Sequence, residues 1–140
     1  MATFSPYLHF AGDAQEAFDL YRSVFGGEFE MKMQYKDAPP NAQNEHTNLN
    51  PDWIMHVGLK TNMGLTIQGS DRPTAYGPVN RGDAFYINLT VDSAEEAKKI
   101  YDELSAGGNI MMPLEKTFWA ELFGMFSDKY GVQWMLNFNG

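Results

Sequence analysis

One short stretch of the sequence combines aromatic rings with a carboxylate. It runs Phe118-Trp119-Ala120-Glu121-Leu122-Phe123, and alternation along a strand predicts that Trp119, Glu121 and Phe123 share one face. On the wall of a pocket, Glu121 could serve as an acid, a base or a polar anchor. A strand whose glutamate only reaches solvent fits the same pattern. Glu121 is therefore a candidate catalytic residue without an assigned role.

The three histidines are the other groups that could do chemistry near neutral pH. We expect His9 to pack beneath a helix, His56 to be a core or pocket histidine, and His46 to be solvated in a polar loop. No short spacing of the kind found in zinc sites joins them. A metal site made of His9, His56 and Glu121 stays open as an alternative.

Further polar and soft side chains occur in patterns that suit a binding pocket. Tyr86 and Asn88 alternate on a predicted strand, so they share a face and are either pocket groups or satisfied core polar groups. The chain also holds nine methionines. Flexible thioethers suit an adaptable lining for an apolar ligand, although ordinary core packing explains them as well.

Composition excludes several classes of function. The chain has 140 residues, a formal charge of −8 and no cysteine, which removes disulfides, thiolate ligands and cysteine nucleophiles. No basic cluster is present that could bind nucleic acid. No apolar run reaches the roughly 18–20 residues of a membrane span, and no basic, then apolar, leader opens the sequence. We expect a cytoplasmic protein without nucleic-acid or membrane partners.

Hydrophobic periodicity predicts the same order of elements twice. The first half has a strand over 5–11, a helix that Asp13 and Glu16 begin as a capping box, a strand over 28–35 and a hairpin over 54–67. The second half has a strand over 84–91, a helix capped by Asp92 or Ser93, and strands near 109–112, 119–126 and 132–138. A loop over 36–53, either a lid or a plain excursion, and a polar connector over 69–83 complete the chain.

Subtraction supports an internal repeat. Tyr21 and Tyr101 lie 80 residues apart, as do Gly27 and Gly107, whereas the later turn glycines Gly64 and Gly131 lie 67 apart. One such unit is too small to bury its sheet alone. The sequence predicts an α+β fold of two tandem βαβββ modules, about 1–70 and 84–140, within a single domain over 1–140. They would form a curved mixed sheet with the helices outside.

Specific stretches of sequence resemble a known family. These are Pro6-Tyr7-Leu8, Phe25-Gly26-Gly27, 117–124 (TFWAELFG) and 128–135 (DKYGVQWM). They resemble the PhnB-like proteins of the glyoxalase/bleomycin-resistance/extradiol dioxygenase (vicinal oxygen chelate) superfamily, some of which carry the label 3-demethylubiquinone 3-methyltransferase domain. The resemblance implies a small-molecule ligand in a trough and a homodimer.

The resemblance also implies where a metal centre would be. Metal-dependent members use His, Glu or Gln on the first and last strands of each half, and these positions map to Pro6, Gln68, Tyr86 and Met135. Only Gln68 is a reasonable oxygen ligand. We therefore expect no superfamily-type metal centre and no cofactor, with a divalent metal kept as the alternative.

Function is predicted from these residues together. The expectation is a PhnB-like small-molecule-binding protein, and the alternatives are a metal-dependent lyase, isomerase or dioxygenase with displaced ligands, or an antibiotic-sequestering resistance protein. A methyltransferase is disfavoured because no glycine-rich strand-to-helix turn of a Rossmann unit is present. The candidate pocket residues are Gln68, Tyr86, Asn88, Trp119, Glu121, Met135 and His56.

Overall fold

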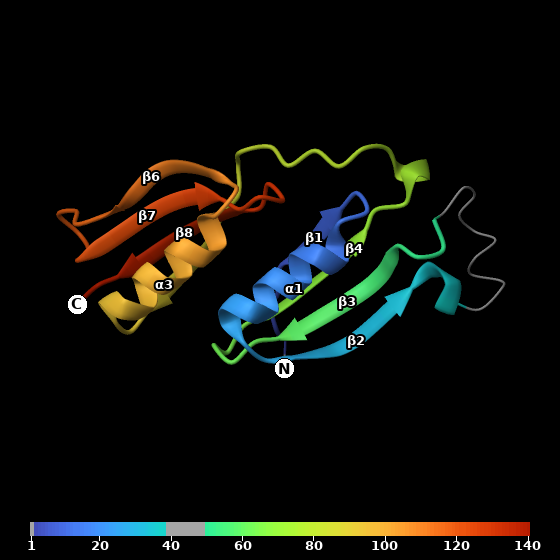
Figure 1. The fold of residues 1–140 in the computed structure, drawn as a ribbon, viewed down its shortest axis with the longest axis horizontal. Coiled ribbons are helices and arrows are strands. Elements are labelled where there is room, and N and C mark those ends of the chain that lie inside the picture. The colour runs from blue at the N-terminus through green and yellow to red at the C-terminus, as the bar shows by residue number, and fades with distance from the viewer. Residues whose placement is uncertain (1, 39–49) are drawn as a thin grey trace. The chain divides into compact units, whose positions relative to one another are not determined.

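Two compact units make up the chain. The computed structural model describes residues 2–38 and 50–140, and the units are Met1–Asn80 and Arg81–Gly140 (Figure 1). The predictions for residues 39–49, including a solvated His46, lie outside the described residues. No described helix has the length and hydrophobicity needed to cross a bilayer.

The first unit is a four-stranded mixed sheet with one helix. The strands lie in the order β1-β4-β3-β2, with β1 parallel to β4 and the other neighbours antiparallel. Its elements are β1 (Tyr7–Phe10), α1 (Ala14–Phe25), β2 (Glu28–Gln34), η1 (Tyr35–Asp37), β3 (Ile54–Lys60), β4 (Thr66–Asp71) and η2 (Thr74–Tyr76).

The second unit repeats this arrangement. Its order is β5-β8-β7-β6, again with one parallel pair between the first and last strands. Its elements are β5 (Ile87–Val91), α3 (Ala94–Ser105), β6 (Asn109–Glu115), β7 (Leu122–Ser127) and β8 (Gln133–Phe138). The predicted βαβββ repeat is thus confirmed, and β7 begins at Leu122 rather than at Trp119.

Each helix covers one face of its own sheet and leaves the other face uncovered by a helix of that unit (Figure 1). The rings of Phe10 and Phe18 of α1 meet edge-on with their centroids 6.0 Å apart, and those of Phe126 and Tyr101 of α3 do so at 5.7 Å. Trp134 is fully buried in the second unit. Because strand side chains alternate, the residues between these core positions point to the face away from the helix. We call the two resulting surfaces the first and second open faces.

The N-terminus of α1 is capped from a distant strand. Asp13 occupies the cap position without a side-chain cap bond, so the predicted capping box with Glu16 is wrong. Asp71, buried at the end of β4, instead accepts hydrogen bonds from the backbone N–H groups of Gly12 (2.8 Å), Ala14 (3.0 Å) and Ile54 (2.8 Å). Its carboxylate thereby ties the helix to β3. Ser93 caps α3 as predicted, accepting from Glu96 N.

A buried tyrosine joins the same point. Tyr35 donates its hydroxyl proton to the main-chain oxygen of Asp71 at 2.8 Å. Burial, reinforced by the nearby charge of Asp71, raises the pKa of Tyr35 from 10.0 to about 12. The neutral phenol is therefore the form that the folded chain stabilises.

This raised pKa predicts a loss of stability in alkali. The unfolded chain ionises Tyr35 first, so the stabilisation is complete below pH 10 and is lost as the pH rises through about 12. Tyr35→Phe should remove this dependence and cost about 1 kcal/mol at neutral pH through the lost hydrogen bond. Urea unfolding of both proteins across this range is the measurement. Parallel losses of stability in the two would contradict the assignment.

Corresponding turns in the two units use different side chains to accept hydrogen bonds from equivalent backbone N–H groups. Thr61 Oγ1 accepts from the N–H groups of Met63 and Leu65. Asp128, 67 residues later, accepts from the equivalent N–H groups of Tyr130 (2.9 Å) and Val132 (3.1 Å), and also from Trp134 Nε1 (3.0 Å). The repeat therefore extends to turn chemistry that residue identity hides.

Strand register shows that the first strands and the helices of the repeat follow different offsets. Gln68 pairs with Tyr7, and its counterpart Met135 pairs with Asn88, so the first strands correspond at 81 residues. The helices, from Ala14 and Ala94, keep the predicted 80. A one-residue difference moves a strand side chain to the opposite face of its sheet. Predictions carried from the helix to the strand therefore need correction.

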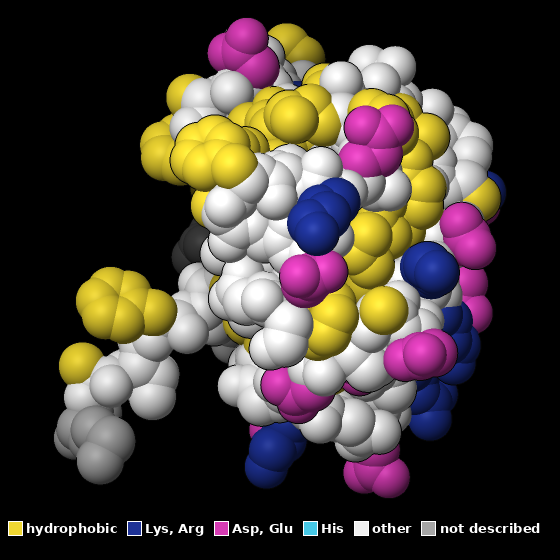
Figure 2. Space-filling model, turned by 90° about the vertical axis from the view of Figure 1, so that its left-hand side faces the viewer, with side chains coloured by type: hydrophobic (Ala, Val, Ile, Leu, Met, Phe, Trp, Pro, Cys, Tyr) yellow, Lys and Arg dark blue, Asp and Glu magenta, His cyan; other side chains and the backbone are white. Residues whose placement is uncertain are grey.

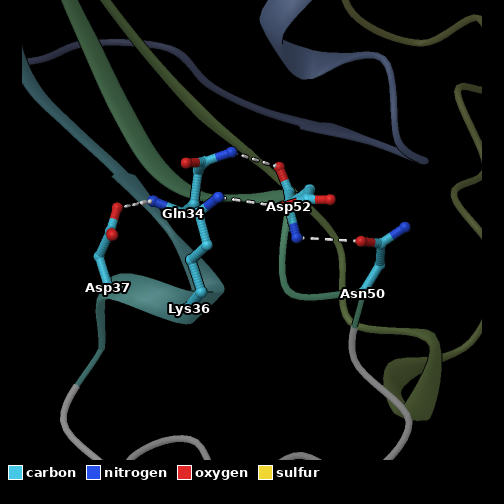
Figure 3. A network of polar contacts seen from close by, with 5 residues as sticks. All are labelled: Gln34, Lys36, Asp37, Asn50 and Asp52. Atoms are coloured by element: carbon cyan, nitrogen blue, oxygen red, sulfur yellow. Dashed lines mark hydrogen bonds and ion pairs between the residues drawn. The ribbon is translucent and has the colours of Figure 1, made fainter.

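The chain on either side of residues 39–49 is held together by a polar network (Figure 3). Gln34 N donates to Asp37 at 2.9 Å, and Gln34 Nε2 donates to the Asp52 main-chain oxygen at 2.9 Å. Lys36 and Asp52 form an ion pair at 3.1 Å, with both side chains more than half exposed. Exposed pairs contribute little to stability, so the network mainly fixes the chain around Lys36 to the chain around Asp52.

Candidate functional site

The first open face carries aromatic and polar side chains from three adjacent strands. Tyr7 and His9 alternate with the core residues of β1, His56 alternates with the core residues of β3, and Gln68 lies beside Tyr7 on β4. The prediction that His9 packs beneath the helix is wrong. Phe10 fills that position, and the ring of His9 meets Tyr7 edge-on at 5.8 Å.

Tyr7 and His56 form the shortest side-chain pair on this face. The Tyr7 hydroxyl lies 3.0 Å from His56 Nδ1, and the two rings lie 5.6 Å apart at 34°. The Tyr7 side chain remains 46% exposed. A phenol hydrogen-bonded to an imidazole can give or take a proton. This pair is therefore the first unit's strongest candidate for acid–base chemistry.

His9 is held by an arginine that also anchors the chain beyond β4. Arg72 Nη1 lies 3.2 Å from His9 Nδ1, while its other nitrogens donate to the main-chain oxygens of Gly77 (3.1 Å) and Tyr76 (2.6 Å). Guanidinium is a donor only, so His9 Nδ1 is the acceptor in this hydrogen bond. Arg72 thus fixes the tautomer of His9 and ties η2 to β1.

The second open face is built differently, around thioethers. Met112 pairs with Met125 across β6 and β7, and Met125 pairs with Met135 across β7 and β8. Asn88 of β5 continues this row beside Met135 and accepts a hydrogen bond from Asn137. Directly opposed residues on neighbouring strands hold their Cβ atoms about 5 Å apart. We call Met112, Met125 and Met135 the methionine row.

Aromatic rings border the methionine row. The ring centroid of Trp119 lies 5.3 Å from that of Phe123 and 4.7 Å from that of Phe118, and Trp119 is half exposed. Phe123 lies on the same face as Met125, two residues along β7. Figure 2 shows hydrophobic side chains at one surface of the molecule between acidic and basic groups. Met112 and Trp119 are themselves exposed, so this side of the second unit is partly accessible.

Glu121 does not occupy the predicted strand position. It precedes β7, which begins at Leu122, and its side chain is exposed close to Gly140. The Trp119 and Phe123 rings are still in contact, although Glu121 does not share a strand face with them. Among residues 2–38 and 50–140, Glu121 has no hydrogen-bond partner that would position it as an acid or base, so its catalytic role stays a prediction.

The positions implied for a metal shift by one residue in the first unit. Ser5, rather than Pro6, lies beside Gln68, with the Ser5 hydroxyl donating to Gln68 Oε1 at 3.4 Å. The strand offset of 81 then pairs Ser5 with Tyr86. By this register the positions that the resemblance implies are Ser5 and Gln68 in the first unit and Tyr86 and Met135 in the second. They offer a hydroxyl, an amide, a phenol and a thioether, a neutral donor set unlike the carboxylates and imidazoles that divalent ions commonly bind.

Other potential metal ligands do not cluster either. Across residues 2–38 and 50–140, no three His, Asp or Glu side chains lie close enough to hold an ion. His9 and His56 share the first open face, but each directs Nδ1 to a protein partner. The alternative set with Glu121 would take its third member from the other unit.

The predicted pocket residues thus fall into two groups. Gln68 and His56 share the first open face, and Asn88 and Met135 share the second. Tyr86 directly precedes β5 and alternates with Asn88, and Trp119 borders the methionine row. Sequence reasoning missed Ser5, Tyr7 and Arg72. Tyr7 could have been found from the motif Tyr7-Leu8-His9, in which the alternate residues are both aromatic and polar.

Comparison with known proteins gives the family. A sequence model of the Glyoxalase/Bleomycin resistance protein/Dioxygenase superfamily matches residues 3–136. Protein YjdN of Escherichia coli K12 is 35% identical over 137 residues, which cover 95% of this chain and 92% of YjdN.

Solved structures agree with this result. PA1353 from Pseudomonas aeruginosa is 37% identical with a TM-score of 0.87, covering 99% of this chain and 98% of its own. A Bacillus cereus protein named PhnB, and provisionally a 3-demethylubiquinone-9 3-methyltransferase, is 25% identical with a TM-score of 0.81, covering 98% and 99%. The chain belongs to the Glyoxalase/Bleomycin resistance protein/Dioxygenase superfamily, and its neighbours there are PhnB-like.

Proposed function

We propose that this PhnB-like protein binds a small, partly apolar molecule on its open sheet faces, without a divalent metal. The observation that carries the proposal is the methionine row, which places three flexible thioethers on adjacent strands away from the helix-covered core. Met112 is 39% exposed. Contiguous apolar side chains at a surface mark interaction sites, which supports a ligand on this face.

The chemistry of the row indicates the kind of ligand. Methionine is unbranched and polarisable, so it adapts its shape and makes favourable contacts with aromatic rings. Trp119 supplies a further ring at the border of this face. An apolar or aromatic molecule fits such a surface better than a sugar or a phosphate, and the charge of −8 also opposes anions.

Several broader expectations belong to the same proposal. The neutral donor set Ser5, Gln68, Tyr86 and Met135 supports binding without a metal and weakens the metal-dependent alternative. A homodimer and the sequestering of an antibiotic stay predictions from the family resemblance, and a cytoplasmic location stays a prediction from composition. The methyltransferase name of the Bacillus cereus relative gains no support from this chain, since neither helix follows a glycine-rich phosphate-binding turn.

Binding of a neutral fluorescent probe tests the proposal. N-phenyl-1-naphthylamine brightens in apolar surroundings, and we expect it to bind the wild-type chain. Met125→Ala should weaken this binding about fivefold to tenfold because it removes apolar contact area. Met125→Leu keeps that area and should stay within about twofold. Equal affinities for wild type and Met125→Ala, with both folded by circular dichroism, would contradict a ligand on this face.

A further inference from the structure

The Tyr7–His56 pair has one nitrogen left for a ligand. His56 Nδ1 lies against the Tyr7 hydroxyl, and His56 Nε2 has no hydrogen-bond partner among the described residues. Within that same part of the chain, no buried side-chain nitrogen or oxygen lacks a partner. His56 Nε2 must therefore reach the molecular surface, where it can meet solvent or a bound molecule.

The direction of the hydrogen bond with the Tyr7 hydroxyl determines whether His56 Nε2 is a donor or an acceptor. When the hydroxyl donates to Nδ1, the neutral ring carries its proton on Nε2 and can donate to a carbonyl oxygen. When Nδ1 carries the proton and donates to the phenol oxygen, Nε2 can accept from a hydroxyl group. Both arrangements fit the 3.0 Å contact and carry the same net charge. His56 can thus bind either kind of oxygen.

The surrounding rings and charges narrow the ligand further. Tyr7 is 46% exposed, with His56 tilted on one side and His9 meeting it edge-on, so part of its ring remains available for stacking. Arg72 directs its guanidinium nitrogens to His9 and to two main-chain oxygens. This face therefore presents neutral hydrogen-bonding groups rather than an unengaged cation, which favours an uncharged oxygen over a carboxylate.

We propose that His56 is a ligand-binding residue whose Nε2 hydrogen-bonds a hydroxyl or carbonyl oxygen on a planar unsaturated ring lying against Tyr7. Tyr7 is the positioning residue that sets the tautomer of His56. This inference rests on the proposed function and names the substrate class: flat, oxygen-bearing aromatic or quinone-like molecules. The first open face therefore carries a polar recognition group of its own.

Two probes of the same shape test this inference. 2-Naphthol carries the oxygen, and 2-methylnaphthalene replaces it with a methyl group, so the ratio of their dissociation constants reports the hydrogen bond. His56→Phe, which keeps a flat ring, should reduce the wild-type preference for naphthol by about fivefold to tenfold. Tyr7→Phe should reduce it partly and leave the affinity for methylnaphthalene within about twofold. Tyr101→Phe, on α3 of the second unit, is the matched control.

A spectroscopic measurement separates positioning from simple support of the fold. The side-chain ¹⁵N shifts of His56 report which nitrogen carries the proton, and we expect naphthol to change them in wild type. Tyr7→Phe should alter the tautomer balance before any ligand is added.

The outcomes are distinguishable. If methylnaphthalene binds and the naphthol preference is unchanged in His56→Phe, this inference is wrong and the proposed function stands. If neither probe binds the wild-type protein, both are wrong.

Discussion

Asp71→Ala is expected to lower the free energy of unfolding by about 3 kcal/mol or more. The substitution leaves the N–H groups of Gly12, Ala14 and Ile54 without their acceptor in a buried place. Each unsatisfied buried group costs roughly 1–3 kcal/mol, against a total stability of about 5–15 kcal/mol for a typical domain. Urea denaturation followed by circular dichroism measures the change. A loss below about 1 kcal/mol would mean that water replaces the carboxylate at little cost.

Asp13→Ala is the matched control for Asp71. Asp13 occupies the formal cap position of α1, but among the described residues its side chain accepts a single hydrogen bond, from Ala11 N at 3.4 Å, which is long and exposed. Its removal should cost no more than a few tenths of a kcal/mol, within the range of surface substitutions. The contrast tests whether the helix start depends on the local cap or on the carboxylate from β4.

Gly27→Ala is the second substitution with a large expected effect, about 3 kcal/mol. Gly27 adopts φ +100, which side chains rarely tolerate, and an added Cβ would lie 2.0 Å from the main-chain oxygen of Lys60. The backbone would have to move where β2 begins, beside the end of β3. The midpoint of thermal unfolding and the urea stability should both fall. Unchanged stability would show that α1 and β2 can separate freely at this junction.

Two other glycines calibrate that result. Gly64 has φ +77 but nothing within 4 Å of a new Cβ, so Gly64→Ala should cost only about 1 kcal/mol of backbone strain. A Cβ added at Gly108 would lie 2.0 Å from the Ser127 main-chain oxygen, and Gly108 does not have a positive φ. Gly108→Ala should therefore show the steric part of the cost by itself. The structure makes Gly108, rather than the predicted Gly107, the counterpart of Gly27.

Most of the fold could be predicted because its local patterns agree with one another. Apolar residues at helical spacing around Tyr21 and Tyr101, turn glycines and alternating strands define the elements, and the repeat defines their order. The limits of the strands were harder to predict. At β7, Thr117 and Ala120 form a turn through Thr117 N donating to Ala120 O, so the strand begins after Glu121.

The candidate site could be predicted only in part, for a geometrical reason. The face that a strand residue occupies depends on its exact position along the strand. The first unit has one more residue between strand and helix than the second, so the faces expected for Pro6 and His9 were reversed. The partnerships of Asp71 and of Arg72 join residues up to 63 positions apart. No local pattern encodes such contacts.

The different offsets of helix and strands have a consequence for how this molecule tolerates change. The connections 11–27 and 92–108 have equal length, yet α3 begins one residue earlier within its connection than α1 does. Hydrogen-bonded neighbours hold a strand in place, whereas a helix contacts its sheet through a broad apolar stripe and can slide. An insertion at one end of a helix, balanced by a deletion at the other, leaves the sheet undisturbed. Variants with one residue inserted before α1 and one deleted after it should therefore lose less stability than variants with a residue inserted in a strand.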